Sequence, residues 1–242
     1  MTRETKFKKE QARLLSPMLF VTGMQKEAAC FAHEGVETLC SSANVSKLCA
    51  ALEDIQDINF SAVISIGLAG GLDPSLRPGD VVIADAVIND GIRLPTHARL
   101  FEALTDAVSA TGDKFYKGAL IGVDHVVLDT QTKKHLFATT QARAVDMESH
   151  VAEKFARAKQ LPFGALRVIS DPATRTLPPL VTKAITANGD VNIAHILKEL
   201  LRAPDQIQGL ILAGLDSRAA FASLRRSGAL LGPLLRLMLT DL

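Results

Sequence analysis

The sequence has few aromatic residues and no excess of charge of either sign. Only 5% of its 242 residues are aromatic, with no tryptophan and one tyrosine, so platforms for stacking nucleic-acid bases are scarce. The 27 basic and 26 acidic residues nearly cancel, to a formal net charge of +1, which argues against a general phosphate-binding field. Together these two shortages argue against nucleic acid as a partner.

Cysteines and long apolar runs are also scarce. Cys30, Cys40 and Cys49 form no CxxC pair and cannot all pair with one another, which favours a reducing compartment. Ser16 and Pro17 interrupt the first apolar stretch, which does not resemble a signal peptide. No apolar run approaches the ~20 residues that cross a bilayer. We therefore expect a cytoplasmic protein, and because the histidines lack metal-ligand spacing, we expect no metal site.

What the sequence does have is apolar content, 48% of its residues, arranged in two alternating patterns. Short runs rich in β-branched residues predict strands over 18–21, 62–66, 80–88, 118–127 and 163–169. Helical patterns begin near Gln25 and cover about 43–56, 97–109, 147–160 and 190–202. This alternation is typical of an α/β protein with a mostly parallel sheet covered by helices. In such sheets the ligand lies beyond the carboxyl ends of the strands.

From about residue 202 the sequence changes character. Leu and Ala recur at helical spacing with arginines between them, which predicts two or three short amphipathic helices. We therefore expect a catalytic domain over residues 1–202 and a C-terminal amphipathic helical extension over 203–242. Packing onto the domain or a subunit interface is the favoured role of the extension, and a basic surface that rests on a membrane is the alternative.

Four segments place glycines or carboxylates where strands end: GMQKE at 23–27, GLAGGL at 67–72, VDMES at 145–149 and RVISDP at 167–172. The glycines let the backbone approach a ligand, but there is no GxGxxG pattern, so a dinucleotide site is not predicted. Taken singly, each carboxylate has an ordinary explanation. Glu27 would lie on a solvated helix face, Glu148 at a helix N-terminus and Asp171 in a turn.

Taken in order, the segments TGMQKE, GLAGGL with GDVVIAD, VDME and RVISD resemble the nucleoside phosphorylase superfamily. That superfamily includes the purine nucleoside phosphorylases and the methylthioadenosine/S-adenosylhomocysteine nucleosidases, and the resemblance runs from about residue 18 to 200. It implies a three-layer fold with a central mixed, mostly parallel sheet flanked by helices. It also implies cleavage of the N-glycosidic bond of an adenine nucleoside by a homo-oligomer, with a dimer favoured. No cofactor is implied, but a phosphorylase would use inorganic phosphate as co-substrate.

The resemblance also implies roles for individual residues. Asp171 would protonate N7 of the departing purine, Glu148 would bind the ribose hydroxyls, and Glu27 would activate the attacking water. The other predicted substrate-binding residues are Met147 against the sugar, Val126 and Val127 on a strand beside the base, and Gly67, Leu68, Ala69, Gly70 and Ser170.

The chemistry of the bond agrees with these residue types. Breaking C1′–N9 gives a cation-like sugar and a poor leaving group, which an acid near N7 and a carboxylate near the sugar would assist. For this role Asp171 must carry a proton near neutral pH, a state that burial favours. His125 could also reach the base, although a structural role is favoured for it.

Water is favoured over phosphate as the nucleophile. Hexameric purine phosphorylases hold phosphate with an arginine near the first motif and an Arg-x-Gly-Ser arrangement at the glycine loop, and the corresponding places here resemble Glu27, Ser65 and Leu68. A carboxylate near a bound anion costs several kcal/mol in a poorly solvated site.

The nucleosidases have serine where this sequence has Leu68, and the C-terminal tail resembles that of the hopanoid-associated phosphorylases, which act on adenosylhopane. The resemblance therefore implies an adenosylhopane nucleosidase, at the inner face of the membrane if the tail touches lipid. A methylthioadenosine/S-adenosylhomocysteine nucleosidase or a purine nucleoside phosphorylase is the alternative. A catalytically silent nucleoside-binding relative is a third hypothesis, from a different class.

Overall fold

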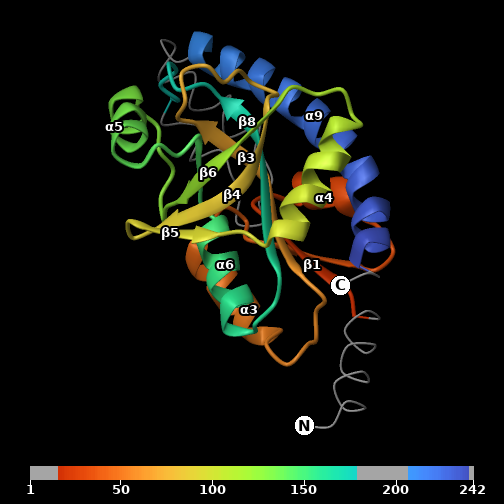
Figure 1. Cartoon of the computed structure of the whole chain (residues 1–242). Coiled ribbons are helices and arrows are strands. Elements are labelled where there is room, and N and C mark those ends of the chain that lie inside the picture. The colour runs from red at the N-terminus through yellow and green to blue at the C-terminus, as the bar shows by residue number, and fades with distance from the viewer. Residues whose placement is uncertain (1–15, 179–206, 240–242) are drawn as a thin grey trace, which may run out of the picture.

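A computed structural model describes residues 16–178 and 207–239 and shows a twisted sheet with helices on both faces (Figure 1). The eight strands are β1 (Met18–Thr22), β2 (Val36–Cys40), β3 (Val63–Gly71), β4 (Val81–Asn89), β5 (Ile92–Pro95), β6 (Phe115–Gly122), β7 (Ala144–Asp146) and β8 (Phe163–Asp171). The helices are α2 (Gln25–Ala28), the 3₁₀-helix η1 (Ala29–Phe31), α3 (Val45–Asp54), α4 (Ala98–Ser109), α5 (Thr130–Thr140), α6 (Ser149–Ala158) and α9 (Ile207–Leu239).

The sheet is mixed and mostly parallel, as predicted. Strands β2, β1 and β3 pair in parallel at one side. Beyond them five strands close into a ring: β3 pairs β8 in parallel, β8 pairs β4 antiparallel, β4 pairs β6 and β6 pairs β7 in parallel, and β7 returns to β3 antiparallel. The closed ring brings the ends of β3, β6, β7 and β8 close together.

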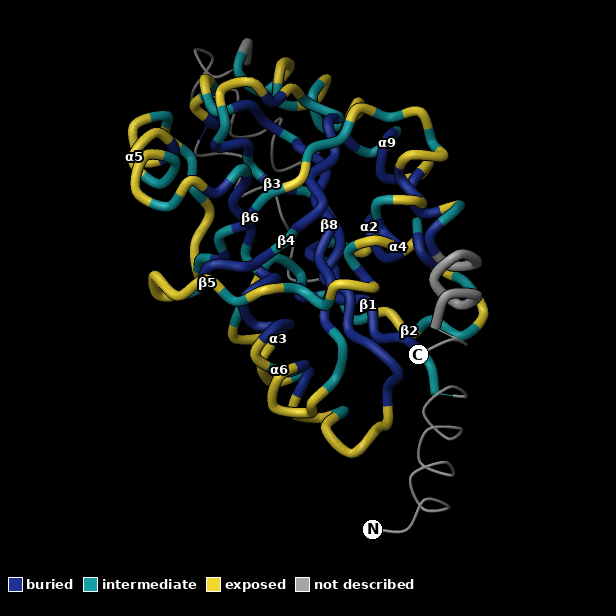
Figure 2. Tube along the Cα trace, in the orientation of Figure 1, coloured by how far each residue is buried: buried dark blue, intermediate teal, exposed yellow. Residues whose placement is uncertain are grey.

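The two faces of the sheet are covered by different helices. Side chains alternate along a strand, so Phe20 of β1 packs with α4 and α9, whereas Leu19 packs with α3 and α6. Figure 2 shows the strands buried between helices that are exposed on their outer sides. The predicted three-layer α/β fold is confirmed.

The C-terminal segment differs from the prediction of two or three short helices. Helix α9 is continuous over 33 residues. Ala220, Leu224 and Leu231 are buried in the core that α4 and the sheet form, so the helix completes one face of the molecule. The domain boundary at 202/203 and the helix expected over 190–202 lie outside the described residues. None of the helices in 16–178 or 207–239 is long and apolar enough to span a membrane.

One strand ends earlier than predicted. Strand β6 stops at Gly122 rather than continuing to Val127, because its neighbour β7 ends at the paired residue Asp146, where the chain turns into α6. The ring of His150 lies only 2.3 Å from where a Cβ at position 122 would be, so only glycine fits there. Val126 and Val127 therefore lie in a loop and not on a strand.

Candidate active site

A pocket of about 1040 Å³ lies where β1, β3 and β8 end, as expected for an α/β sheet. Its sheet side is lined by Gly23, Met24, Lys26 and Glu27 after β1, by 68–70 of β3, by 145–148 at the end of β7 and just before α6, and by 170–171 of β8. Its opposite side is lined by α9, including Leu210, Ala213, Gly214 and Phe221. Glu27, Glu148 and Asp171 thus come from three distant parts of the sequence and open into one pocket.

Glu27 is held by backbone N–H groups. Its Oε2 accepts hydrogen bonds from the amides of Gly23 (2.7 Å) and Met24 (2.9 Å), and its Oε1 accepts one from the amide of Leu68 (2.9 Å). Burial raises the pKa of Glu27, while the bond from Leu68 and the charge of Arg167 oppose that rise. The ordinary explanation, a glutamate on a solvated helix face, is therefore wrong, since Glu27 is only 2% exposed.

Glu148 lies beside Glu27, and Gly23 separates the two carboxyl groups. A Cβ at Gly23 would lie 3.1 Å from Glu148 Oε1 and 3.2 Å from Glu27 Oε2. Ser41 donates a hydrogen bond to Glu148 Oε1 (2.9 Å), and the Arg167 guanidinium lies 3.7 Å from Oε2. Burial raises the pKa of Glu148 to about 7, Arg167 lowers it, and the carboxylates of Asp146 and Glu27 raise it further.

Arg167 is fully buried and contacts the residues that hold Glu148. Its Nε lies 2.9 Å from Asp146 Oδ2, and its Nη2 donates to Ser65 Oγ (2.7 Å). Asp146 Oδ1 in turn accepts hydrogen bonds from the backbone amides of Glu148 and Ser149 at the start of α6. The guanidinium therefore balances the negative charge of two buried carboxyl groups, Asp146 and Glu148.

Asp171 lies at the end of β8 and is 5% exposed. Its Oδ2 forms an ion pair with the ammonium group of Lys133, and its Oδ1 accepts a hydrogen bond from Ser170 Oγ (2.7 Å). The expected burial of Asp171 is thus present. The expected protonation of Asp171 stays a prediction.

The remaining predicted residues lie around these three carboxyl groups. Leu68, Ala69, Gly70, Ser170, Val126, Val127 and Met147 all line the pocket. Gly67 does not line it, but its backbone packs against Glu27, whose Oε2 would lie 2.7 Å from a Cβ at that position. The glycine segment therefore packs against a protein carboxylate, and the amide of Leu68 donates to that carboxylate.

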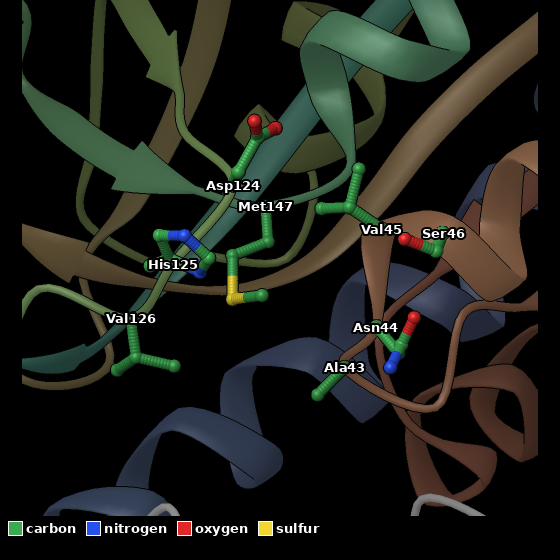
Figure 3. Close-up of a pocket in the computed structure, with 8 residues that line it drawn as sticks. All are labelled: Ala43, Asn44, Val45, Ser46, Asp124, His125, Val126 and Met147. Atoms are coloured by element: carbon green, nitrogen blue, oxygen red, sulfur yellow. The ribbon is translucent and has the colours of Figure 1, made fainter.

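A second cavity of about 520 Å³ adjoins the first and shares four of its lining residues, Ala43, His125, Val126 and Met147. Figure 3 shows the Met147 side chain between His125 on one side and Ala43 to Ser46 on the other. His125 is exposed and lines both cavities, and the structural role favoured for it stays a prediction.

Several site residues were not predicted from the sequence. They are Ser41 beside Glu148, Lys133 beside Asp171, and the α9 residues opposite the sheet. Arg167 lies in a predicted motif, RVISD, without a predicted role. The described residues contain no cluster of three or more His, Cys, Asp or Glu side chains that could hold a metal ion.

Comparison with known proteins places this site in a family context. The family model described as the phosphorylase superfamily matches residues 4–202. The 5′-methylthioadenosine/S-adenosylhomocysteine nucleosidase of Baumannia cicadellinicola is 28% identical over 187 residues, which are 67% of this chain and 82% of that protein. The protein with the same name from Lysinibacillus sphaericus is 26% identical over 163 residues, 57% of this chain and 70% of its own.

Solved structures share the fold over nearly the whole chain. The 5′-methylthioadenosine/S-adenosylhomocysteine nucleosidase of Neisseria meningitidis, in complex with methylthio-immucillin-A, gives a TM-score of 0.67 at 16% identity and covers 94% of this chain and 100% of that one. The futalosine hydrolase of Helicobacter pylori gives a TM-score of 0.63 at 15% identity and covers 95% and 99%. At such identities the likeness shows the fold alone.

Proposed function

The chain belongs to the phosphorylase superfamily, and we propose that it is an enzyme that hydrolyses the N-glycosidic bond of an adenine nucleoside. The observation that carries this proposal is the meeting of three buried carboxyl groups, Glu27, Glu148 and Asp171, in one pocket. The similar proteins named as nucleosidases support the same reaction. A binding protein without catalysis would not need three buried carboxyl groups, which are costly to desolvate.

The three groups divide the reaction between them. Asp171 donates a proton to N7 of adenine as the C1′–N9 bond breaks, so that the base leaves as a neutral molecule. Glu148 binds the ribose hydroxyls and stabilises the positive charge that develops on the sugar. Glu27 orients the water that adds to C1′ and accepts its proton, as one carboxylate does in glycoside hydrolysis.

The surroundings of Glu27 favour water over phosphate. The amides of Gly23, Met24 and Leu68 point to one place, as in an anion-binding nest, but the carboxylate of Glu27 itself accepts all three hydrogen bonds. A phosphate ion there would have no free amide from this set and would lie against the carboxyl group of Glu27. Hydrolysis is therefore the reaction that this geometry supports.

The side of the pocket formed by α9 supports an apolar substituent on the substrate. Leu68, Leu210, Ala213 and Phe221 present apolar side chains to the pocket. We propose adenosylhopane, an adenine nucleoside attached to a triterpenoid lipid, as the substrate. The exposed side chains Ile211, Leu212 and Leu215 on the same part of α9 would allow contact with the membrane that holds such a lipid.

The test is adenine release from adenosylhopane and from methylthioadenosine, each with and without phosphate. We expect release without phosphate, faster from adenosylhopane, and a fall of about 10²–10⁴-fold in D171N, because the general acid is lost. D57N, which changes an exposed aspartate outside the pocket, serves as the matched control.

Each alternative outcome points to a different error. Release that requires phosphate would show that the enzyme is a phosphorylase and that Glu27 has another role. Selectivity for methylthioadenosine would contradict the lipid substrate while leaving the reaction intact. Adenine binding without any turnover would contradict the enzymatic proposal.

A further inference from the structure

Lys133 is a fully buried lysine whose ammonium group contacts the carboxylate of Asp171. We propose that Lys133 is a positioning residue for Asp171: it holds the carboxyl group by Oδ2 and leaves Oδ1 as the oxygen that carries the proton for the departing base. The inference rests on the proposed function, in which Asp171 is the general acid.

The ammonium group of Lys133 has acceptors for all its protons. Besides Asp171 Oδ2, it donates to the backbone carbonyl oxygens of Pro172 (3.2 Å) and Arg175 (3.1 Å). These contacts connect α5 with the turn that follows β8, directly after the acid. The carboxyl group of Asp171 is thereby tied to two other segments of the chain, and its orientation is fixed.

Stability alone does not explain a lysine at this position. Lys133 is the single buried residue of α5, a helix whose other side chains are at least partly exposed. Replacing a buried ion pair with apolar residues is often neutral or stabilising, because the pair must be removed from water. A buried lysine that contacts the predicted general acid therefore indicates a role in the chemistry.

The hydrogen bonds determine which oxygen of Asp171 can carry a proton. An ammonium group has no lone pair, so a proton on Oδ2 would face the N–H groups of Lys133. On the other side, Ser170 Oγ lies 2.7 Å from Oδ1 and 3.2 Å from the carbonyl oxygen of Ala69. Its single proton can bond Oδ1 when Asp171 is ionised, or Ala69 when Oδ1 is protonated. The arrangement therefore accepts a proton on Oδ1.

In the reaction this proton passes from Oδ1 to N7 as the C1′–N9 bond breaks, and Asp171 returns to the ionised form beside Lys133. The water that is consumed supplies hydroxide to C1′ and the proton that finally restores Asp171. Lys133 is the charged side chain that contacts Asp171 within the described residues.

The experiment compares the pH dependence of adenine release in K133M, K133Q and K133R. K134M changes the exposed neighbour on the same helix and is the matched control. In K133M and K133Q we expect the alkaline limb of the kcat profile to move upward by about one pH unit, because the cation is lost. We also expect kcat at the optimum to fall by about tenfold or more, because the carboxyl group is no longer held. K133R keeps the charge and should leave the alkaline limb in place.

K133Q retains donors for the two backbone carbonyl oxygens and serves if K133M does not fold. An alkaline limb that stays at the wild-type pH in a folded neutral variant would overturn the inference, since a purely structural lysine would not move it. No adenine release by the wild-type protein would instead contradict the proposed function. The two failures are thus distinguishable.

Discussion

The two sides of the pocket are built in different ways. The carboxyl floor, which consists of Glu27, Glu148 and Asp171, is buried and held by backbone amides, by Arg167 and by Lys133. The α9 wall combines small and apolar residues with one serine and two arginines: Leu210, Ala213, Gly214, Ser217, Arg218, Phe221 and Arg225. Fixed charges suit bond cleavage, whereas an apolar wall suits selection of a substituent. We therefore expect changes in the floor to affect every substrate and changes in the wall to affect only some.

Besides D171N, the largest effect is expected in the floor, for E27Q. Three backbone N–H groups donate to the two carboxylate oxygens of Glu27, but glutamine has one oxygen, and its NH₂ group would face a donor. We expect kcat to fall by about 10²-fold or more for both substrates, because the base for water is lost. The free energy of unfolding should fall by about 1–3 kcal/mol.

Steady-state kinetics and denaturant unfolding would check this prediction. E37Q, at an exposed position on β2, is the matched control. An E27Q protein that releases adenine at the wild-type rate would contradict the role of Glu27 as the base for water.

The floor should also make stability depend on pH. Burial raises the pKa of Glu148 from 4.5 to about 7, so the folded protein binds this proton more tightly than the unfolded chain does. The contribution of this proton to the free energy of unfolding is fully present below pH 4.5 and is lost as the pH rises through about 7. We therefore expect E148Q to gain stability relative to the wild type at pH 8 and to lose that advantage at pH 4. Thermal unfolding at both pH values checks this, and an advantage that is equal at both would count against a buried, titrating Glu148.

In the α9 wall, a smaller and selective effect is expected for G214L. Gly214 lines the pocket, and a Cβ added there would have no neighbour within 4 Å. A leucine side chain would narrow the pocket without disturbing the floor. We expect kcat/KM for adenosylhopane to fall by about tenfold, with little change for methylthioadenosine. G214A is the control, and equal losses for both substrates in G214L would show that wall and floor are not separable.

The smallest effect is expected on the outer side of α9. Ile211 and Leu215 are 59% and 58% exposed. In the double variant I211D/L215D we expect several-fold weaker co-sedimentation with vesicles of anionic lipid, because apolar area that enters the lipid boundary is lost. Release of adenine from methylthioadenosine should be unchanged. Equal sedimentation of the wild type and the double variant would contradict membrane contact through this surface.

The carboxyl floor and the α9 wall also differ in how much of each could be predicted from the sequence. The three carboxylates of the floor could be predicted only through the family resemblance, because local patterns taken singly gave Glu27, Glu148 and Asp171 ordinary explanations. The role of Lys133 could not be predicted from the sequence. This residue is one of two adjacent lysines on a polar helix, and its partner Asp171 lies 38 residues away. Periodicity gives no sign of burial in such a case.

For the α9 wall, the sequence predicted only that the C-terminal segment is helical and amphipathic. Leu and Ala at helical spacing predicted two or three short helices, whereas the structure has one continuous helix. Gly228 of this helix packs closely: a Cβ there would lie 2.2 Å from the carbonyl oxygen of Cys30. His33 also contacts the Gly228 carbonyl oxygen at 2.8 Å. Contacts with residues almost 200 positions away keep the helix in place, and no local pattern reports them.

The measurement that tests the account most directly is the origin of the oxygen added at C1′. The reaction would be carried out in H₂¹⁸O with unlabelled phosphate present, and the mass of the sugar product would be measured by mass spectrometry. Hydrolysis by the carboxyl floor predicts a free sugar that carries one ¹⁸O atom from water. A sugar phosphate without the label would contradict the account and would mean that the site containing Glu27 and Glu148 admits an anion.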